Sequence, residues 1–558
     1  MPSARASRGP AVTGWPAERA GYLQHERHRP VRVGPVQVEV ALGFPNRYAV
    51  GMSNLGFLAV YGLLNDLEGV RCERTFLWET EGSGTLESGR PLNRFSMVAF
   101  SVPFELDYIN LLRMLYRDGI PLLSSERKES DPVVIMGGPC AFLNPEPMAP
   151  FMDLVAVGES ERILPGLVDL FRSGSPRSEL IERSARIPGI YVPRYYQIDY
   201  HPRGPIGTVT PLHPAPQKIE RQRTPDLDSF ATISSIVTPR SHLKNMTLLE
   251  VQRGCAYHCR FCAIGQIYRP LRHRSAGILK DQIQGAGDLS ARLGLVGSAV
   301  ADLPGLMELC REMSSQGLEL GLSSLRADRL SEELIGQLAG LGLRTLTVAP
   351  EVGTERLRRV IDKSVRPEDV LRVARLASEA GIARLKLYFL VGLPWERQED
   401  IEAIAALVEH IRAGSQLRGV TVSVSPFVPK ATTPFQWAPM EEEPLLRKKL
   451  DYLAERLRPL KGISFAAESP RRSIWQGVLA RGDRRVGQVL WHHLREGLTW
   501  ARAWRRVGEN GAPVDKAFYA HRRRDRGEVL PWDFIDHGVS REHLWTEFQR
   551  AREAARSS

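Results

Sequence analysis

Three of the six cysteines lie within eight residues, in a C-x3-C-x2-C loop formed by Cys255, Cys259 and Cys262. Three thiolates on one short loop can hold three corners of an iron–sulfur cluster and leave the fourth iron without a protein ligand. The apolar run 246–251 just before the loop predicts a buried strand. We therefore expect the loop to follow the C-terminal end of a strand, where the active sites of parallel βα barrels lie.

A zinc site is the alternative use of the same cysteines. Structural zinc needs four ligands, so His258 or the distant Cys310 would have to complete the site. His258 lies between the cysteines, and no second C-x2-C or C-x2-H pair occurs. A loop at a strand end, followed by further strand–helix units, favours catalysis.

The composition is that of a globular protein with several domains. The chain has 558 residues, 43% of them hydrophobic and 25% charged, and this length suits three or four domains. We find no signal peptide and no membrane span in the sequence, so we expect a cytoplasmic protein, whose reducing surroundings suit cluster cysteines. The net charge of +11 permits an anionic partner such as RNA but does not require one. The scattered Cys72, Cys140 and Cys310 are expected to be small buried hydrophobes.

The N-terminal third predicts a parallel α/β sheet. Residues 1–34 are polar and rich in Pro, Gly and Arg, which predicts a disordered arm. In 35–184, strand-like and helical runs alternate, as in a Rossmann-like domain. Strands are expected at 35–42, 96–101, 133–136 and 154–157, and helices at 57–67 and 106–117.

Glycines follow the last two of these strands. They are Gly137, Gly138 and Gly158, the last of which precedes Glu159. Ligands of parallel sheets bind beyond the C-terminal strand ends, where these residues would lie. Ordinary turn chemistry explains the glycines as well.

A second α/β series predicts a partial barrel. Residues 185–240 are interpreted as a linker, and the barrel as 241–466. Six strands with crossover helices predict a partial (βα)6 TIM-like barrel rather than a closed eightfold one. A further strand at 463–465 would raise the count by one. The six strand-like runs are 246–251, 293–297, 318–322, 345–349, 385–391 and 420–424, and two of the helices between them are 367–380 and 398–411.

The segment 467–558 is a basic, tryptophan-rich region, expected to be mostly helical. From residue 470 it holds six of the ten tryptophans, with arginines between them. Aromatic and arginine side chains together can stack on and clamp nucleic acid. We favour the alternative, in which a small helical cap packs its tryptophans on the barrel and exposes its arginines to solvent.

The cysteine loop resembles the signature of radical S-adenosylmethionine (SAM) enzymes, including the aromatic Phe261 before the last cysteine. The resemblance implies a [4Fe-4S] cluster on Cys255, Cys259 and Cys262, whose fourth iron chelates SAM. One electron then cleaves SAM to methionine and a 5′-deoxyadenosyl radical, which abstracts hydrogen from an unactivated carbon. A low-potential electron donor such as flavodoxin or ferredoxin is implied too.

Later strand ends match the family in chain order. Residues 295–299 stand where the family often has Gly-Gly-Glu, so a contact to SAM there would use the backbone at Gly297 or the side chain of Ser298. Residues 391–394 resemble the family's Gly-x-Pro turn near adenine. The resemblance implies SAM contacts from Phe261, Gly297, Ser298, Ser323, Arg326 and Glu351.

The N-terminal sheet resembles the second half of the cobalamin (B12)-binding domain that precedes the barrel in one class of radical SAM enzymes. Gly137, Gly138, Gly158 and Glu159 would then bind that cofactor. The Asp-x-His-x-x-Gly motif is absent, and the loop 45–56 takes its place. Cobalamin would therefore lack a histidine below cobalt, and a degenerate sheet without cobalamin is the alternative.

The resemblance implies a cobalamin-dependent methyltransferase, or an enzyme of rearrangement or ring formation. A methylthiotransferase acting on tRNA or a ribosomal protein is the alternative, but it needs a second cluster on three N-terminal cysteines, and only Cys72 and Cys140 precede Cys255. A zinc-stabilised RNA-binding protein is the non-enzymatic alternative. The substrate is not identified, and no acid–base residue is assigned. Tyr388, Glu351 and Lys386 are expected at the barrel mouth or interior.

Overall fold

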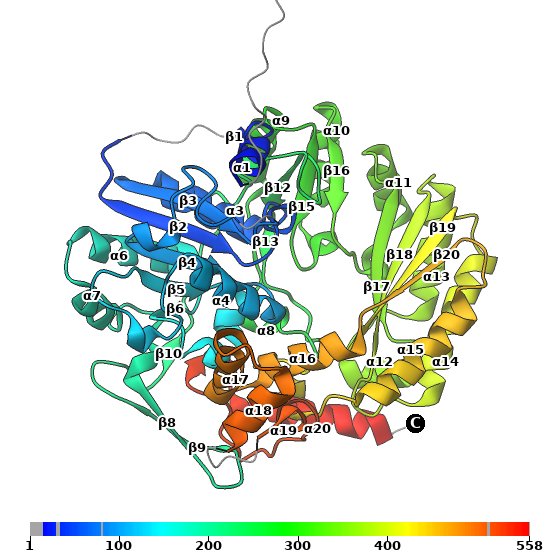
Figure 1. Ribbon diagram of the computed structural model, residues 1–558. Coiled ribbons are helices and arrows are strands. Elements are labelled where there is room, and N and C mark those ends of the chain that lie inside the picture. The colour runs from blue at the N-terminus through cyan, green and yellow to red at the C-terminus, as the bar shows by residue number, and fades with distance from the viewer. Residues whose placement is uncertain (1–14, 29–33, 80–81, 510–513, 557–558) are drawn as a thin grey trace, which may run out of the picture.

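The computed structural model describes residues 15–28, 34–79, 82–509 and 514–556. Figure 1 shows a ring of parts in chain order: the N-terminal sheet domain, the two halves of the barrel, and a C-terminal helical region that returns to the first domain.

The N-terminal domain holds a six-stranded sheet in the order β3-β2-β4-β5-β6-β7. Its first five strands are parallel, as predicted, and β7 (Ile190–Tyr191) adds an antiparallel edge. In chain order the parallel strands run 2-1-3-4-5, the flavodoxin-like arrangement, whose ligand crevice lies between the first and third strands. These strands are β2 (Val38–Phe44), β3 (Val70–Phe76), β4 (Met97–Ser101), β5 (Val133–Gly137) and β6 (Leu154–Ala156).

Helices cover both faces of this sheet, so its strands are apolar on both sides. On one face, α3 (Leu55–Asp66), α6 (Ser160–Arg172) and α7 (Arg177–Ser184) pack against residues such as Val40 and Ile135. On the other face, α4 (Tyr108–Arg117) packs against Val98, Phe100 and Met136. This second core continues into the barrel and the C-terminal region.

The barrel is open, as predicted, and has seven strands instead of six. Strands β12, β15 and β16 form one sheet and β17, β18, β19 and β20 another, all parallel. A single parallel bridge, Leu325 to Val348, joins the two. The bounds are β12 (Met246–Glu250), β15 (Arg292–Val296), β16 (Glu319–Leu322), β17 (Thr345–Glu351), β18 (Arg384–Val391), β19 (Gly419–Pro426) and β20 (Ile463–Ala467).

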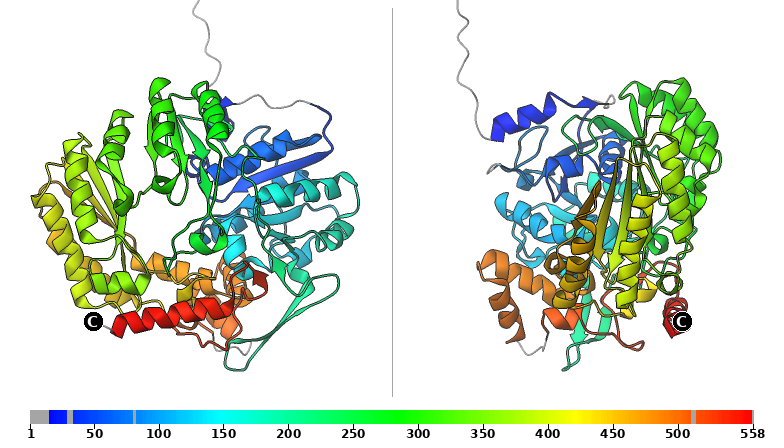
Figure 2. Two further views of the ribbon diagram at one scale, coloured as in Figure 1. Left: turned by 180° about the vertical axis from the view of Figure 1, so that it is seen from behind. Right: turned by 90° about the vertical axis from the view of Figure 1, so that its right-hand side faces the viewer.

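Helices cover one face of each barrel half. They lie on the outside of the ring, and the uncovered faces turn inward (Figures 1 and 2). These helices are α9 (Ala276–Gly287), α10 (Leu306–Ser315), α11 (Glu332–Gly340), α13 (Pro367–Glu379), α14 (Gln398–Ala413) and α15 (Glu443–Leu457).

The predicted arm is partly ordered, which corrects the sequence interpretation for residues 15–28; residues 1–14 and 29–33 lie outside the described part. Residues 15–28 form α1 (Trp15–Leu23) and β1 (Arg27–His28). The ring of Trp15 lies 4.1 Å from that of Trp78. Aromatic packing and the pairing of β1 with β11 (Ile236–Val237) therefore hold this segment on the domain.

The predicted linker contributes strands to other parts of the molecule. Besides β7 and β11, it forms the hairpin β8 (Tyr196–Tyr200) and β9 (Ile206–Pro211). Strand β10 (Ile219–Glu220) pairs in parallel with β21 (Ile535–Asp536), close to the C-terminus. The segment thus ties distant parts of the chain together.

The C-terminal region consists mainly of helices: α16 (Pro470–Arg481), α17 (Arg484–Arg495), α18 (Trp500–Gly508), α19 (Lys516–Ala520) and α20 (Arg541–Arg556). Its tryptophans pack together, since the ring of Trp475 lies 4.6 Å from that of Trp500. Contrary to expectation, three arginines are buried instead of solvated: Arg481, Arg485 and Arg524.

This region binds the N-terminal domain through polar contacts. Arg484 donates to Glu146 at 2.9 Å and to the Tyr191 hydroxyl at 2.7 Å. Asn144 donates to the carbonyls of Ala480 and Gly482 at 3.1 and 2.7 Å. The region therefore closes the ring between barrel and sheet domain.

His537 makes a pH-sensitive contact at the same junction. Its Nε2 donates to the Phe142 carbonyl at 2.9 Å, and the side chain is buried. Burial, with the charge of Arg221, lowers the pKa of His537 to about 4. Since the unfolded pKa is near 6.5, protonation favours unfolding, and stability is lost as pH falls from 6.5 toward 4.

We expect this histidine to cost about 1 kcal/mol of unfolding free energy between pH 6.5 and 5.5. His537→Gln keeps an N–H donor but cannot titrate, so its thermal unfolding midpoint should fall less over this range than that of the wild type. The exposed His410, changed to Gln in the same way, should leave the slope unchanged. Equal slopes in the wild type and His537→Gln would contradict the assignment.

Candidate functional site

The cysteine loop leaves the barrel at the C-terminal end of β12, as predicted. A short antiparallel pair, β13 (Gln252–Arg253) with β14 (Arg272–His273), closes its base. Gly254 follows β13 with φ of 89°, and a Cβ there would lie 2.5 Å from the carbonyl oxygen of Tyr268. Only glycine fits this position, so Gly254 sets the direction in which the loop starts.

Arg260, between the second and third cysteines, anchors the loop to the second barrel half. Its guanidinium donates to the Arg359 carbonyl at 2.7 Å and to Glu547 of α20 at 3.1 Å. Its backbone N–H donates to the Ile361 carbonyl at 2.9 Å, at the end of α12 (Glu355–Ile361). Sequence reasoning did not identify Arg260, because its partners are about 100 and 290 residues away in the chain.

The surrounding protein largely shields the thiols of Cys259 and Cys262 from water, although both residues are partly accessible. Burial raises the pKa of the Cys259 thiol to about 12, against the nearby charge of Lys363. Burial also raises the pKa of Cys262, against backbone hydrogen bonds such as the one from Gly265. Thiolates and not thiols bind iron, so metal binding must displace these protons.

Among the residues described, no three His, Cys, Asp or Glu side chains converge as ligands of one metal ion. An iron–sulfur cluster makes a different demand, because its thiolates bind separate irons. All three loop cysteines are free and partly accessible, so they could hold such a cluster.

Charged side chains from both barrel halves lie near Cys259. Arg326 and Glu351, both predicted as cofactor-binding, contribute to its electrostatics together with Lys363. Glu351 has φ of 67° and accepts from Lys363 at 2.8 Å. The guanidinium of Arg326 lies 3.5 Å from the ring centroid of Tyr257 in the loop. Lys363 and Tyr257 carry no motif that would have identified them in the sequence.

On the first barrel half, Gly297 follows β15 and packs against Gln252, since a Cβ at Gly297 would lie 2.6 Å from Gln252 Cγ. Gln252 is buried, and both of its amide atoms lack a hydrogen-bond partner. A buried amide without partners is costly unless a ligand satisfies it. Ser298 and Ser323 are exposed at neighbouring strand ends.

The three glycines at the strand ends of the N-terminal sheet differ in how much space surrounds them. A Cβ at Gly138, where φ is 91°, would lie 2.9 Å from the backbone of Val102. At Gly158, where φ is 136°, it would lie 2.4 Å from the Gln222 carbonyl. A Cβ at Gly137 would have Ala156 Cβ, at 3.9 Å, as its nearest neighbour. Gly158 is therefore covered by the chain itself, whereas Gly137 is less crowded.

Glu159 is engaged by protein side chains. It accepts from Arg253 and Arg272, each at 2.7 Å, and from the backbone N–H of Thr224. Burial would raise the pKa of Glu159, but these arginines outweigh it and lower the value. The carboxylate thus joins the sheet domain to β13 and β14 at the base of the cysteine loop.

The C-terminal strand ends of the sheet domain meet the cysteine loop. Helix α5 (Pro139–Leu143), which starts after Gly138, contacts α8 (Ile264–Ile267), which starts after Cys262. The ring of Phe142 lies 6.0 Å from that of Tyr268. The open edges of both α/β units therefore face each other across the loop.

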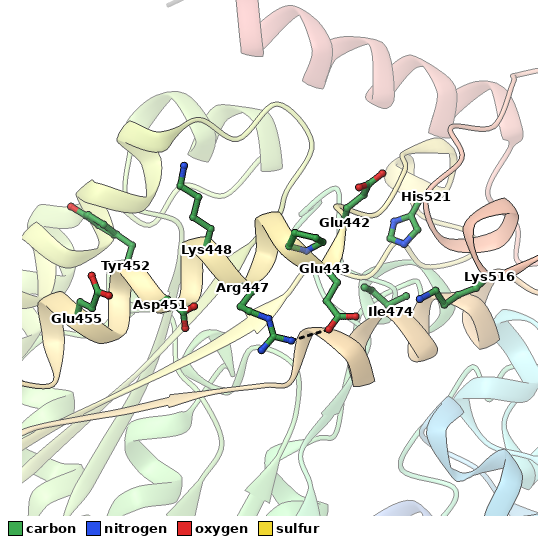
Figure 3. Close-up of a pocket in the computed structure, with 11 residues that line it drawn as sticks. Glu442, Glu443, Arg447, Lys448, Asp451, Tyr452, Glu455, Ile474, Lys516 and His521 are labelled. Atoms are coloured by element: carbon green, nitrogen blue, oxygen red, sulfur yellow. Dashed lines mark hydrogen bonds and ion pairs between the residues drawn. The ribbon is translucent and has the colours of Figure 1, made fainter. Parts of the chain in front are cut away.

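A groove of about 900 Å³ runs along α15 (Figure 3). Its lining mixes both charges, with an ion pair between Arg447 and Glu443 at 2.9 Å. Helix α15 covers the outer face of β18 and β20. The groove lies away from the uncovered face of the barrel.

Comparison with known proteins identifies the chain. Residues 56–193 match the family model of radical SAM proteins, N-terminal, and residues 249–408 match that of the radical SAM superfamily. An uncharacterized protein of Methanocaldococcus jannaschii, MJ0966, is 30% identical over 81% of this chain and 90% of its own length. The chain belongs to the radical SAM superfamily.

This radical SAM protein is also similar to a characterised enzyme and to a solved structure. The anaerobic magnesium-protoporphyrin IX monomethyl ester cyclase of Rubrivivax gelatinosus is 23% identical, over 52% of this chain and 51% of the cyclase. The solved structure of OxsB, a cobalamin-dependent SAM radical enzyme with aqua-cobalamin bound, matches with a TM-score of 0.50 at 13% identity, over 93% of this chain and 80% of OxsB. At this identity the match supports the fold alone. In the described part of the protein, no helix is long and apolar enough to cross a membrane.

Proposed function

We propose that this radical SAM protein is a cobalamin-dependent enzyme that methylates or otherwise modifies an unactivated carbon. The observation that carries the proposal is the meeting of two open edges, the cysteine loop at the end of β12 and the C-terminal strand ends of a 2-1-3-4-5 sheet. Each edge is where its fold binds ligands. Two cofactors bound there would share one reaction space.

The loop chemistry fits a [4Fe-4S] cluster. Cys255, Cys259 and Cys262 would be its ligands, held by Gly254 and Arg260 as described. When bound, such a cluster supplies the single electron that splits SAM into methionine and a 5′-deoxyadenosyl radical. Gln252 offers an unpaired buried amide to SAM, and Arg326 and Glu351 lie beside Cys259 as charged groups for its amino acid part.

Cobalamin is proposed for the sheet domain. OxsB, whose fold is similar, binds aqua-cobalamin. Residues 35–184 include no histidine, so a lower ligand of that type could not come from this domain. Near the end of β2, Asn46 donates to Asp107 at 2.8 Å, and burial raises the pKa of Asp107 to about 6. The crevice beside β2 and β4 is thus polar.

A methylthiotransferase is the second candidate function, and only the similarity of its barrel to the barrel of this chain supports it. It would need a second cluster, but Cys72 and Cys140 are both buried, and burial raises the pKa of each thiol. Neither the tRNA nor the ribosomal-protein substrate has support in the geometry of the described residues.

Anaerobic reconstitution tests the proposal. With SAM and a low-potential donor such as flavodoxin or ferredoxin, the protein should release 5′-deoxyadenosine and contain about four irons per chain. Cobalamin added during reconstitution should co-purify with the protein, and the purified protein should then show the optical spectrum of cobalamin. About eight irons would favour the methylthiotransferase. Zinc without sulfide, or no release of 5′-deoxyadenosine, would refute the proposed radical SAM activity. If the protein bound no cobalamin, the proposed second cofactor would be refuted.

A further inference from the structure

A row of four polar side chains crosses the second barrel half. Thr347 of β17 pairs with Lys386 of β18, Lys386 with Thr421 of β19, and Thr421 with Ser464 of β20. Paired residues of neighbouring parallel strands lie side by side and point to the same face. Lys386 is thus flanked by the hydroxyl-bearing Thr347 and Thr421, and Ser464 lies one strand beyond Thr421 at the same level of the sheet.

The row lies on the face that no helix covers. Along β18, Leu385, Leu387 and Phe389 are buried, whereas Lys386 and Tyr388 between them are partly exposed. The same alternation occurs along β17 and β19. Since helices α13 and α15 contact these strands from the other side, the polar face is the one that turns into the ring (Figure 1). The sequence expectation for Lys386 and Tyr388 therefore agrees with this arrangement.

Lys386 has no acidic partner among the described residues, and its ammonium lies 4.8 Å from the centroid of the Tyr388 ring. Two carboxylates on other strands of the barrel, Glu351 and Glu319, have cations of their own. Glu351 pairs with Lys363 at 2.8 Å, and Glu319 pairs with Arg292 at 3.5 Å. On the first strand, Glu250 binds Arg253 of β13 and Arg274, which directly follows β14. Lys386 is thus an uncompensated cation inside the barrel.

The hydroxyls of the row are also available. No side-chain hydrogen bond joins Thr347, Thr421 or Ser464 to another residue in the described ranges. Hydroxyls can donate to an oxyanion, and a lysine supplies the charge. Charge-assisted hydrogen bonds of this kind are stronger than neutral ones.

We infer that Lys386, with the hydroxyls of the flanking Thr347 and Thr421, binds an oxyanion of the substrate, a carboxylate or a phosphate. The inference rests on the proposed function for the statement that this anion belongs to the substrate. It names a chemical class for the molecule that the enzyme modifies.

The register also indicates where the reacting carbon lies. Thr347 pairs with Lys386, and Glu351, beside Cys259, pairs with Phe389. The strands change register between Val348 and Glu351, so the separation is three residues on β18, from Lys386 to Phe389, or about 10 Å. A substrate anchored at Lys386 would therefore present to the cysteine loop a carbon about 10 Å along its length from the anion.

Equilibrium dialysis of the reconstituted full chain against radiolabelled inorganic phosphate and radiolabelled acetate tests the inference. We expect the wild type to bind one of these anions with a dissociation constant on the order of 1 mM. Lys386→Gln should weaken this binding about ten-fold or more, and Lys386→Arg should retain it. Lys280→Gln, on the exposed side of α9, is the matched control and should bind like the wild type.

Preference for phosphate or for acetate distinguishes a phosphate ester from a carboxylic acid, and either result with loss in Lys386→Gln supports the inference. No saturable binding of either anion, or equal binding by wild type and a folded Lys386→Gln, overturns it. Dialysis needs neither reductant nor SAM. Its failure is therefore distinct from failure to form 5′-deoxyadenosine, which concerns the proposed function.

Discussion

Cys259→Ala should abolish formation of 5′-deoxyadenosine in the reconstituted protein. Cys259 is the middle thiol of the loop. Its removal leaves two protein thiolates for a cluster in which three irons each need one. Loss of an outer-shell partner of a metal ligand typically costs about 10- to 100-fold in activity, so loss of a ligand is expected to cost about 100-fold or more. Product analysis by chromatography and the iron and sulfide content per chain measure the effect.

The matched control is Cys310→Ala. Cys310 is buried, and burial raises the pKa of its thiol to about 11, but it lies on α10, away from the loop. Its substitution removes one small hydrophobe from the core and should leave iron content and 5′-deoxyadenosine near wild-type amounts. Full cluster content and activity in Cys259→Ala would contradict the ligand assignment.

Arg253→Met should destabilise the base of the cysteine loop by about 3 kcal/mol or more. The Arg253 side chain is 10% exposed and contacts Glu159, Glu161 and Glu250 at 2.7 to 2.8 Å. Burial would lower the pKa of Arg253, but Glu250 and the other two carboxylates outweigh it and hold the value raised. Without this arginine, three carboxylates with little exposure to water would face only Arg272 and Arg274.

The measurements are the thermal unfolding midpoint and the iron bound after reconstitution, and both should fall. Arg447→Met serves as the matched control, because Arg447 pairs with Glu443 at 2.9 Å while its side chain is 62% exposed. An exposed pair of this type contributes about 0.5 kcal/mol or less. If Arg253→Met behaved like Arg447→Met, the network would not hold the loop to the sheet domain.

The periodic parts of the fold were predictable. Alternating and continuous apolar runs identified strands β2, β4 to β6, β12 and β15 to β19, because strand and helix periods leave a local pattern in the sequence. Strand β20 remained open as a candidate, since its short run lacks a buried alternation. Residues 15–28 were misjudged, because Trp15 gains its packing from Trp78, distant in the chain.

The candidate site was predictable only in part. Arg326 and Glu351 lie beside Cys259, where family order placed them. Glu159 was expected to bind a cofactor and is bound by Arg253 and Arg272. Gly158, expected in the same role, packs against Gln222.

By itself, the sequence determined the chemistry available: three thiols at C-x3-C-x2-C spacing, on a loop between a strand and further βα units, which is a local property of the chain. Only the tertiary structure decided what surrounds that loop. Lys363 and Arg260 contact partners on other strands and helices, and Gln252 is buried against Gly297 of another strand end. The row around Lys386 exists because four strands pair in one register. Such contacts follow from long-range packing, which leaves no periodic signal in the sequence.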